Sequence, residues 1–305
     1  MKRVRRAAWG LFALVPLAIC AADKPPGVAV ERNVIYGMHS GAALLLDVYR
    51  PARPNGYGVV FVAGSGWQAE PEYGAIPIKE RQVDLWGPPL TAAGYTVFAV
   101  NHRGAPAFHY PAALEDVQRA IRFVRANAVR FGIDGGRLGG LGGSSGGNLI
   151  GLAAMRASPG NAADPDAVNR EPATLQAIVL RAAVTDLRNL PTAEGAHYVV
   201  SYMETPPGES AATKALYGGA SPVTQVRTGA PPTLLIHGDA DALIPYQQSV
   251  DMEAALRGAG VATKLVTVPG GVHGADFGAA GKPHPEWPNY YAQTVAWFDQ
   301  HLRPR

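Results

Sequence analysis

Two adjacent serines in a glycine-rich turn are the first residues of this chain that could act as nucleophiles. They lie in the stretch GGLGGSSGGNLIGLAA, and the pattern Gly-x-Ser-x-Gly fits both Ser144 and Ser145. A serine in such a turn between a strand and a helix has a strained backbone that exposes its hydroxyl, provided that the residues two before and two after it are small. The pattern alone permits either serine, and in so glycine-rich a chain a flexible loop is the alternative.

A serine nucleophile needs a histidine that accepts its proton and a carboxylate that orients the histidine. Asp239 and Asp241 follow the apolar run LLIHG, where the end of a strand would place an acid, although one of them can equally be a turn residue. His273 follows the run LVTVPGG on a short loop flanked by glycines, and His284 is the alternative base. The chain therefore contains a candidate for each catalytic group, in the order serine, aspartate, histidine.

Apolar runs and helix-like segments alternate along most of the chain, and these elements must position the candidate groups. Strands are predicted at 28–37, 42–51, 58–67, 95–104, 137–142, 175–186, 231–239 and 261–271. Helices are predicted at 111–132, 146–155, 246–260 and 288–302, with a further helical segment that ends near residue 94. This alternation favours an α/β fold with a mostly parallel sheet and helices on both faces. The segment from about 186 to 221 is too long for a plain connection, so we expect a small helical cap there.

The first residues, MKRVRRAAWGLFALVPLAICAAD, have the layout of a secretory signal peptide, with a basic start, an apolar run and small residues. We expect cleavage after residue 22, export to the periplasm or the medium, and a single catalytic domain over residues 23–305. The alternatives are an uncleaved anchor, although the apolar run is shorter than the roughly 20 residues of a membrane span, and lipid attachment at Cys20, although Ile19 stands where a small residue is wanted.

Without this segment the chain has 23 basic and 24 acidic residues, so its basic pI does not indicate a nucleic-acid partner. Cys20 is the only cysteine and leaves with the signal peptide, which excludes disulfides, a thiol nucleophile and cysteine metal sites in the mature chain. We expect no metal, no cofactor and no stable membrane span after cleavage, and the composition leaves the oligomeric state open.

The motifs together resemble those of α/β-hydrolase carboxylesterases and acetyl esterases related to hormone-sensitive lipase. The resemblance is carried by FVAGSGW, by the stretch from Asn101 to Leu149, and by LLIHGDADALIP and PGGVHG. In that family the nucleophile stands seven residues after the arginine that opens the strand, which from Arg137 is Ser144. The same matching implies that Asp241 is the acid and that His273 is the base.

The early glycine turn is where the chain departs from this family. The family's His-Gly-Gly-Gly-Trp appears here as Ala63-Gly64-Ser65-Gly66-Trp67. The resemblance implies an oxyanion hole formed by the backbone N–H groups of Ser65, Gly66 and Ser145, in which each donor lowers the barrier by about 3 kcal/mol. The histidine that steadies the loop in that family is therefore absent here, and a serine replaces the middle glycine.

The expected function is that of a serine carboxylesterase that hydrolyses small or medium acyl esters through an acyl-enzyme, with a small-molecule ester as its partner. A peptidase or polyester depolymerase of the same fold is the nearest alternative, and a non-catalytic binding protein is a more distant one. Trp67, Tyr198 and Tyr202 are candidate substrate contacts, although core packing accounts for such aromatic residues equally well.

Overall fold

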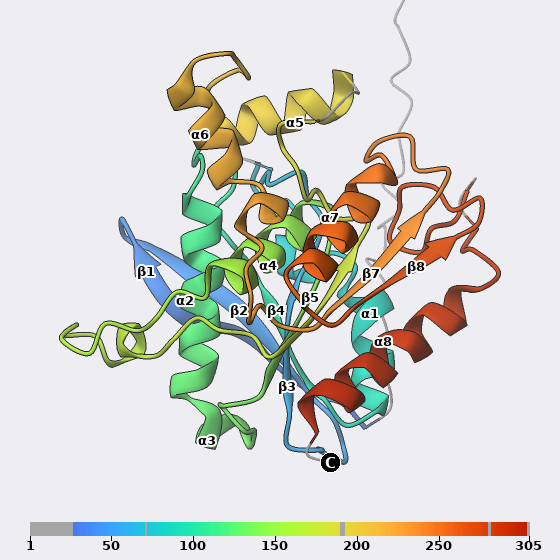
Figure 1. Cartoon of the computed structure of the whole chain (residues 1–305). Coiled ribbons are helices and arrows are strands. Elements are labelled where there is room, and N and C mark those ends of the chain that lie inside the picture. Colours follow the sequence, from blue (N-terminus) through green and yellow to red (C-terminus); the bar gives the residue numbers. More distant parts are fainter. Residues whose placement is uncertain (1–26, 71, 190–192, 280–281, 304–305) are drawn as a thin grey trace, which may run out of the picture.

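A single eight-stranded sheet organises the protein, which is described from a computed structural model covering residues 27–303 except 71, 190–192 and 280–281 (Figure 1). The strand order is β1-β2-β4-β3-β5-β6-β7-β8. β1 and β2 pair antiparallel with each other, β2 pairs antiparallel with β4, and all other neighbours are parallel. The strands are β1 Ala29–His39, β2 Ala42–Arg50, β3 Gly58–Val62, β4 Thr96–Val100, β5 Leu138–Gly143, β6 Ala177–Arg181, β7 Thr233–Gly238 and β8 Thr263–Val268.

Helices cover both faces of this sheet, and each face has its own hydrophobic cluster. One cluster joins the sheet to α2, α4 and α7, and the other joins it to α1 and α8. The α-helices are α1 Val83–Ala92, α2 Ala112–Ala126, α3 Ala128–Phe131, α4 Ser144–Arg156, α5 Ala193–Met203, α6 Ala211–Gly219, α7 Gln247–Gly258 and α8 Trp287–Leu302. Short 3-10 helices span Ile78–Glu80, Ala167–Arg170 and Pro222–Gln225. The predicted α/β fold, with a mostly parallel sheet between two layers of helices, is confirmed.

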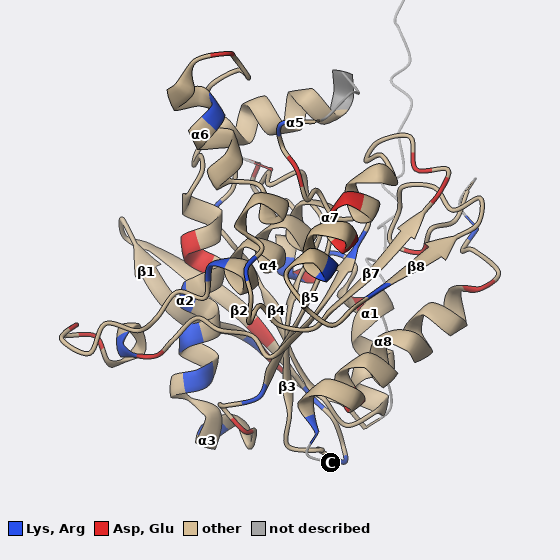
Figure 2. Ribbon diagram, in the orientation of Figure 1, with Lys and Arg blue, Asp and Glu red and all other residues tan. Residues whose placement is uncertain are grey.

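The central strands are apolar because they are buried on both faces. Every residue of β3, β4, β5 and β7 is buried. None of these four strands contains Lys, Arg, Asp or Glu, so they are tan in Figure 2. This is why continuous apolar runs, and not alternating patterns, predicted these strands.

Two predictions differ from the structure in detail. The helix predicted over 111–132 is divided into α2 and α3 at Asn127, whose φ of −107° is not helical. Strands predicted to extend into the loops end earlier, so that Gly64, Ser65 and Gly66 follow β3 and lie outside the sheet. The predicted strand 58–67 is too long because the residues after β3 pack against the turn at Ser144 and Ser145, and such buried loop residues resemble a strand in sequence.

Helices α5 and α6 lie between β6 and β7, and Figure 1 shows them above the ends of the central strands. They occupy the region in which the helical cap was predicted. The signal peptide predicted at residues 1–22, including Cys20, lies outside the described residues. Within the described part of the chain, no helix has both the length and the apolar character needed to cross a bilayer.

Candidate active site

Ser144 occupies a sharp turn between β5 and α4. Its φ is +52°, in the left-handed region that a side chain rarely adopts. A Cβ at Gly142 would collide with the backbone of Gly146, and a Cβ at Gly146 would collide with the carbonyl oxygens of Val62 and Ala63 at the end of β3 and just after it. The frame of small residues centred on Ser144 is therefore the one that lets strand and helix cross so closely.

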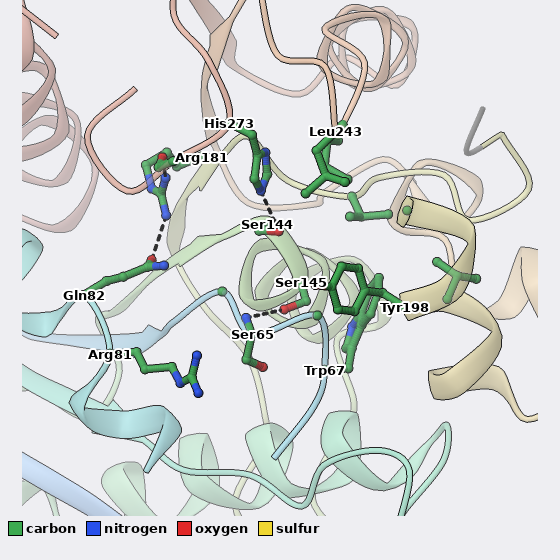
Figure 3. A pocket seen from close by; sticks show the side chains of 17 residues that line it. Ser65, Trp67, Arg81, Gln82, Ser144, Ser145, Arg181, Tyr198, Leu243 and His273 are labelled. Carbon is green, nitrogen blue, oxygen red and sulfur yellow. Dashed lines mark hydrogen bonds between the residues drawn. The ribbon is translucent and has the colours of Figure 1, made fainter. Parts of the chain in front are cut away.

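The structure brings together Ser144, at the start of α4, with Asp241 and His273, which lie on the loops after β7 and β8 at the carboxyl edge of the sheet. His273 Nε2 lies 3.2 Å from Ser144 Oγ, and His273 Nδ1 lies 2.7 Å from Asp241 Oδ2 (Figure 3 shows the first contact). Nδ1 donates to the carboxylate, so Nε2 is the nitrogen available to accept the serine proton. This arrangement can support nucleophilic attack by Ser144 on a carbonyl carbon.

The Asp241 carboxylate receives four donors. Oδ1 accepts the backbone N–H groups of Leu243 and Ile244 at 3.0 and 2.8 Å, and Oδ2 lies 2.7 Å from His273 and 3.3 Å from His237 Nε2. Burial by itself would raise the pKa of the Asp241 carboxyl, but the hydrogen bonds from His237, His273 and Ile244 together hold it well below its ordinary value. Asp241 is therefore ionised and oriented throughout the neutral range.

His237 is a residue of the site that the sequence analysis did not single out. It is fully buried, and its Nε2 lies 3.0 Å from the Ile244 carbonyl oxygen, while its Nδ1 lies 2.7 Å from Ser249 Oγ. Because both neighbours of Nε2 are acceptors, Nε2 carries a proton and donates, and Nδ1 accepts from the Ser249 hydroxyl. The position of His237 at the end of β7, four residues before Asp241, was the available signal.

The alternative acid and base lie elsewhere. Asp239 is exposed, and its Oδ1 accepts the Gly270 N–H at 2.6 Å, which closes the turn after β8. His284 Nε2 lies 3.0 Å from the Pro269 carbonyl oxygen, and its Nδ1 accepts the N–H of Glu286. Both residues have structural roles in turns, and neither lines the cavity at Ser144.

The loop after β3 lies against the nucleophile turn, but one predicted oxyanion donor has a partner within the protein. The Ser65 N–H donates to Ser145 Oγ at 2.9 Å (Figure 3). Gly66 has a φ of +63°, and a Cβ there would collide with the ring of Tyr198. Ser145 is fully buried, and its hydroxyl holds the loop through this hydrogen bond. The resemblance implies a role only for the backbone N–H of Ser145.

Trp67 and Asn148 hold the far end of this loop. The Trp67 ring stacks on Tyr202 with centroids 4.7 Å apart, and its Nε1 donates to Asn148 Oδ1 at 3.2 Å. Asn148 Nδ2 donates to the carbonyl oxygens of Val184 and Ala220, both at 3.0 Å. The buried Asn148, which the sequence analysis read only as part of the helix pattern, therefore links the loop to the strand end after β6 and to the chain after α6.

The predicted substrate contacts separate into two kinds. Trp67 and Tyr198 line the cavity at Ser144, which has a volume of about 270 Å³. Tyr202 does not line it, because it is fully buried behind Trp67. The expectation that Tyr202 contacts substrate is therefore replaced by a supporting role for its ring behind the cavity wall.

The cavity includes no cluster that suggests a metal centre. Among the residues that the structure describes, no three His, Cys, Asp or Glu side chains are arranged to hold a metal ion.

Residues 46–256 match the BD-FAE family. The chain belongs to the BD-FAE family. The match covers the chain from β2 to α7 and so includes Ser144 and Asp241, while His273 lies beyond it. The resemblance to α/β-hydrolase esterases seen in the sequence is confirmed by this family and by the relatives that the chain matches.

Two relatives illustrate the range of similarity. The BD-FAE chain is 31% identical over 270 residues to esterase LipQ of Mycobacterium tuberculosis strain H37Rv, across 82% of this chain and 58% of LipQ. It therefore spans less than two thirds of that relative's length. It is 30% identical over 298 residues to the ethyl acetate hydrolase of Pseudomonas putida, across 92% of this chain and 85% of that protein.

A solved structure agrees with the fold. A truncated carbohydrate esterase from gut microbiota superposes with a TM-score of 0.72 at 25% identity, over 89% of this chain and 95% of that one. A thermophilic esterase from Thermogutta terrifontis superposes with a TM-score of 0.70, and at 23% identity this likeness bears on the fold alone.

Proposed function

We propose that this BD-FAE chain is a serine carboxylesterase that hydrolyses small or medium acyl esters. The observation that carries the proposal is the contact of His273 Nε2 with Ser144 Oγ at 3.2 Å, with Asp241 at 2.7 Å behind the same ring. The strained backbone of Ser144 and the adjoining cavity support it. The names of relatives, an esterase and an ethyl acetate hydrolase, agree with this reaction class.

The reaction proceeds in two steps that mirror each other. Ser144 Oγ attacks the ester carbonyl carbon while its proton moves to His273 Nε2, and this proton then passes to the leaving alcohol. Asp241 stabilises the imidazolium during the transfer. Water next loses a proton to His273 and attacks the acyl-enzyme, after which the acid departs and Ser144 regains its proton.

The oxyanion needs donors in the loop after β3 and at the start of α4. The N–H groups of Gly66 and Ser145 serve this role, and the Ser65 N–H joins them only when it leaves the Ser145 hydroxyl. The small cavity favours short acyl groups, since ligand pockets are ordinarily about 300 to 1,000 Å³.

A fluorophosphonate probe tests the reaction class directly. The wild-type chain should be labelled at Ser144, and Ser144→Ala should lose labelling and about 10⁶-fold in kcat. Equal labelling of the variant, or none of the wild type, would contradict the proposal. A series of 4-nitrophenyl esters from acetate upward should show falling kcat/KM as the acyl chain lengthens.

The same proposal includes the destination of the protein. Residues 1–22 act as a signal peptide, and residues 23–305 form one catalytic domain that is exported to the periplasm or the medium. The support is the basic start, the apolar run and the small residues before Asp23. The N-terminal sequence of the mature protein tests it.

A further inference from the structure

The two sides of the cavity at Ser144 differ in chemistry. Figure 3 shows Trp67, Tyr198 and Leu243 on one side of Ser144, with Arg81, Gln82 and Arg181 on the other. The first side offers apolar surface to a substrate. The second side is polar, and among the described residues that line the cavity two are arginines and none is Asp or Glu.

Arg181 is the main charge of this polar side. It ends β6, is only 3% exposed, and packs so closely on the backbone before Ser144 that a side chain at Gly143 would collide with its guanidinium. Its Nη1 donates to the Gly274 carbonyl oxygen, and its Nη2 donates to Gln82 Oε1 at 2.8 Å. Both partners are neutral, and no carboxylate of the described residues lies within 4 Å of the guanidinium.

Aromatic rings surround Arg181, and no carboxylate among the described residues lines the cavity beside it. Trp86 and Phe277 cover the guanidinium with their rings at 5.5 and 5.7 Å. Asp276 and Asp241 attract the guanidinium from beyond ion-pair distance and partly offset its charge, but neither lines the cavity. Burial lowers the pKa of the Arg181 guanidinium to about 10, so the group remains protonated at neutral pH.

Gln82 adds donors to the same wall. Because its Oε1 accepts from Arg181, its amide nitrogen is the end that remains for a ligand, and that nitrogen donates to no described residue. Arg81 is paired with Glu70 through Nη2 at 2.5 Å, but its Nε is buried and has no partner in the described part of the chain. The wall therefore presents donors and positive charge, and it presents few acceptors.

We propose that this wall binds a carboxylate of the substrate, so that the preferred esters carry an anionic group a few bonds from the scissile carbonyl. A carboxylate accepts several hydrogen bonds at once and matches a guanidinium in geometry and charge. The inference rests on the proposed esterase function and adds the chemical class of the ester. The carboxylate can belong to the acyl portion or to the alcohol portion.

Matched pairs of esters test this inference. In each pair a carboxylate is replaced by a primary amide of the same shape: 3-acetoxybenzoate with 3-acetoxybenzamide for the alcohol side, and monoethyl glutarate with ethyl 4-carbamoylbutanoate for the acyl side. The readout is the ratio of kcat/KM for the anion to that for the amide. A variant that is catalytically weaker toward both esters of a pair leaves this ratio unchanged.

Gln82→Glu is the informative variant, since a carboxylate at this position pairs with Arg181 and repels an anionic substrate. The ratio should fall about tenfold or more in at least one pair, and that pair identifies the side of the ester that carries the charge. The matched control is Gln293→Glu, where the glutamine Oε1 accepts from Lys264 Nζ at 2.8 Å outside the cavity. It adds the same charge and should leave the ratio unchanged.

The outcomes separate this inference from the proposed function. The carboxylate site is overturned if Gln82→Glu leaves the ratio unchanged for both pairs, or if Gln293→Glu lowers it equally. In either case, hydrolysis of the esters that carry the primary amide still supports the esterase function. Loss of the preference in concentrated salt supports the charge-based origin. If the wild-type chain hydrolyses none of these esters, including 4-nitrophenyl acetate, the esterase function itself is overturned.

Discussion

The two loops that face Ser144 are held in different ways. On the acid and base side, Asp241 receives four hydrogen bonds, and each of its two oxygens accepts a pair of them. On the oxyanion side, the loop after β3 is held by neutral hydrogen bonds at Ser65 and Trp67 and by the packing of Gly66 and Trp67. The first loop is therefore held through a charged carboxylate, whereas the second is held by neutral hydrogen bonds and by packing.

This difference explains how the protein manages without the histidine that the resemblance places at Ala63. Ala63 is buried, and it cannot hold the loop through a polar side chain. The Ser145 hydroxyl and the stacked pair of Trp67 and Tyr202 supply contacts from α4 and α5 instead. Damage to the charged side should therefore abolish chemistry, whereas damage to the packed side should weaken it by degrees.

The largest contrast is expected for Asp241→Asn, which should lower kcat about 10⁴-fold, because an amide cannot stabilise the His273 imidazolium and favours the wrong tautomer. Steady-state hydrolysis of 4-nitrophenyl acetate measures it. Asp239→Asn is the matched control and should change kcat little, since Asp239 only closes a turn. Comparable losses in both variants would contradict the assignment of the acid.

On the packed side, Asn148→Ala should lower kcat about tenfold to a hundredfold, because the oxyanion loop loses its link to α4 and its donors move. Three buried groups lose their partner, so the free energy of unfolding should fall by about 3 kcal/mol. Denaturant unfolding and kcat are measured together, with Asn169→Ala outside the cavity as control. A loss of stability with unchanged kcat would show that packing alone positions the loop.

A smaller effect is expected for Ser145→Ala, which removes the hydroxyl but keeps the backbone N–H. The variant should retain kcat within about fivefold, since one neutral hydrogen bond contributes about 1 kcal/mol. Burst kinetics with 4-nitrophenyl acetate would locate any change in acylation or deacylation. A loss as large as that of Ser144→Ala would mean that the reactive hydroxyl has been assigned to the wrong serine.

The smallest effect concerns acid stability. The pKa of Asp241 is lower in the folded chain than in the unfolded one, where it is about 3.9. Its contribution to the free energy of unfolding is therefore complete above about pH 5 and is lost as the pH falls below about 4. Thermal unfolding should show that the difference in Tm between wild type and Asp241→Asn becomes smaller from about pH 6 to about pH 3. A constant difference would contradict the claim that the ionised Asp241 carboxylate stabilises the folded chain.

Much of the site could be predicted because its residues stand at the ends of recognisable strands. The carboxyl ends of parallel strands meet at one edge of a sheet, so Asp241 after β7 and His273 after β8 had to approach the turn after β5. His237, Asn148 and Arg181 escaped prediction for a common reason. Each is a polar residue inside an apolar run. The partners of Asn148 and Arg181 come from segments distant in the sequence, whereas those of His237 lie four to twelve residues further along the chain.

The sequence by itself determined the order of strands and helices, the small residues that permit the turn at Ser144, and the three side chains of the candidate triad, because these depend on local pattern and on strand ends. Only the tertiary structure decided that Ser145 binds the oxyanion loop and that Tyr202 lies behind the cavity wall. It alone placed Arg181 beside the nucleophile without a carboxylate of the described chain in reach. Such roles depend on distances between side chains of different elements, and packing in three dimensions sets those distances.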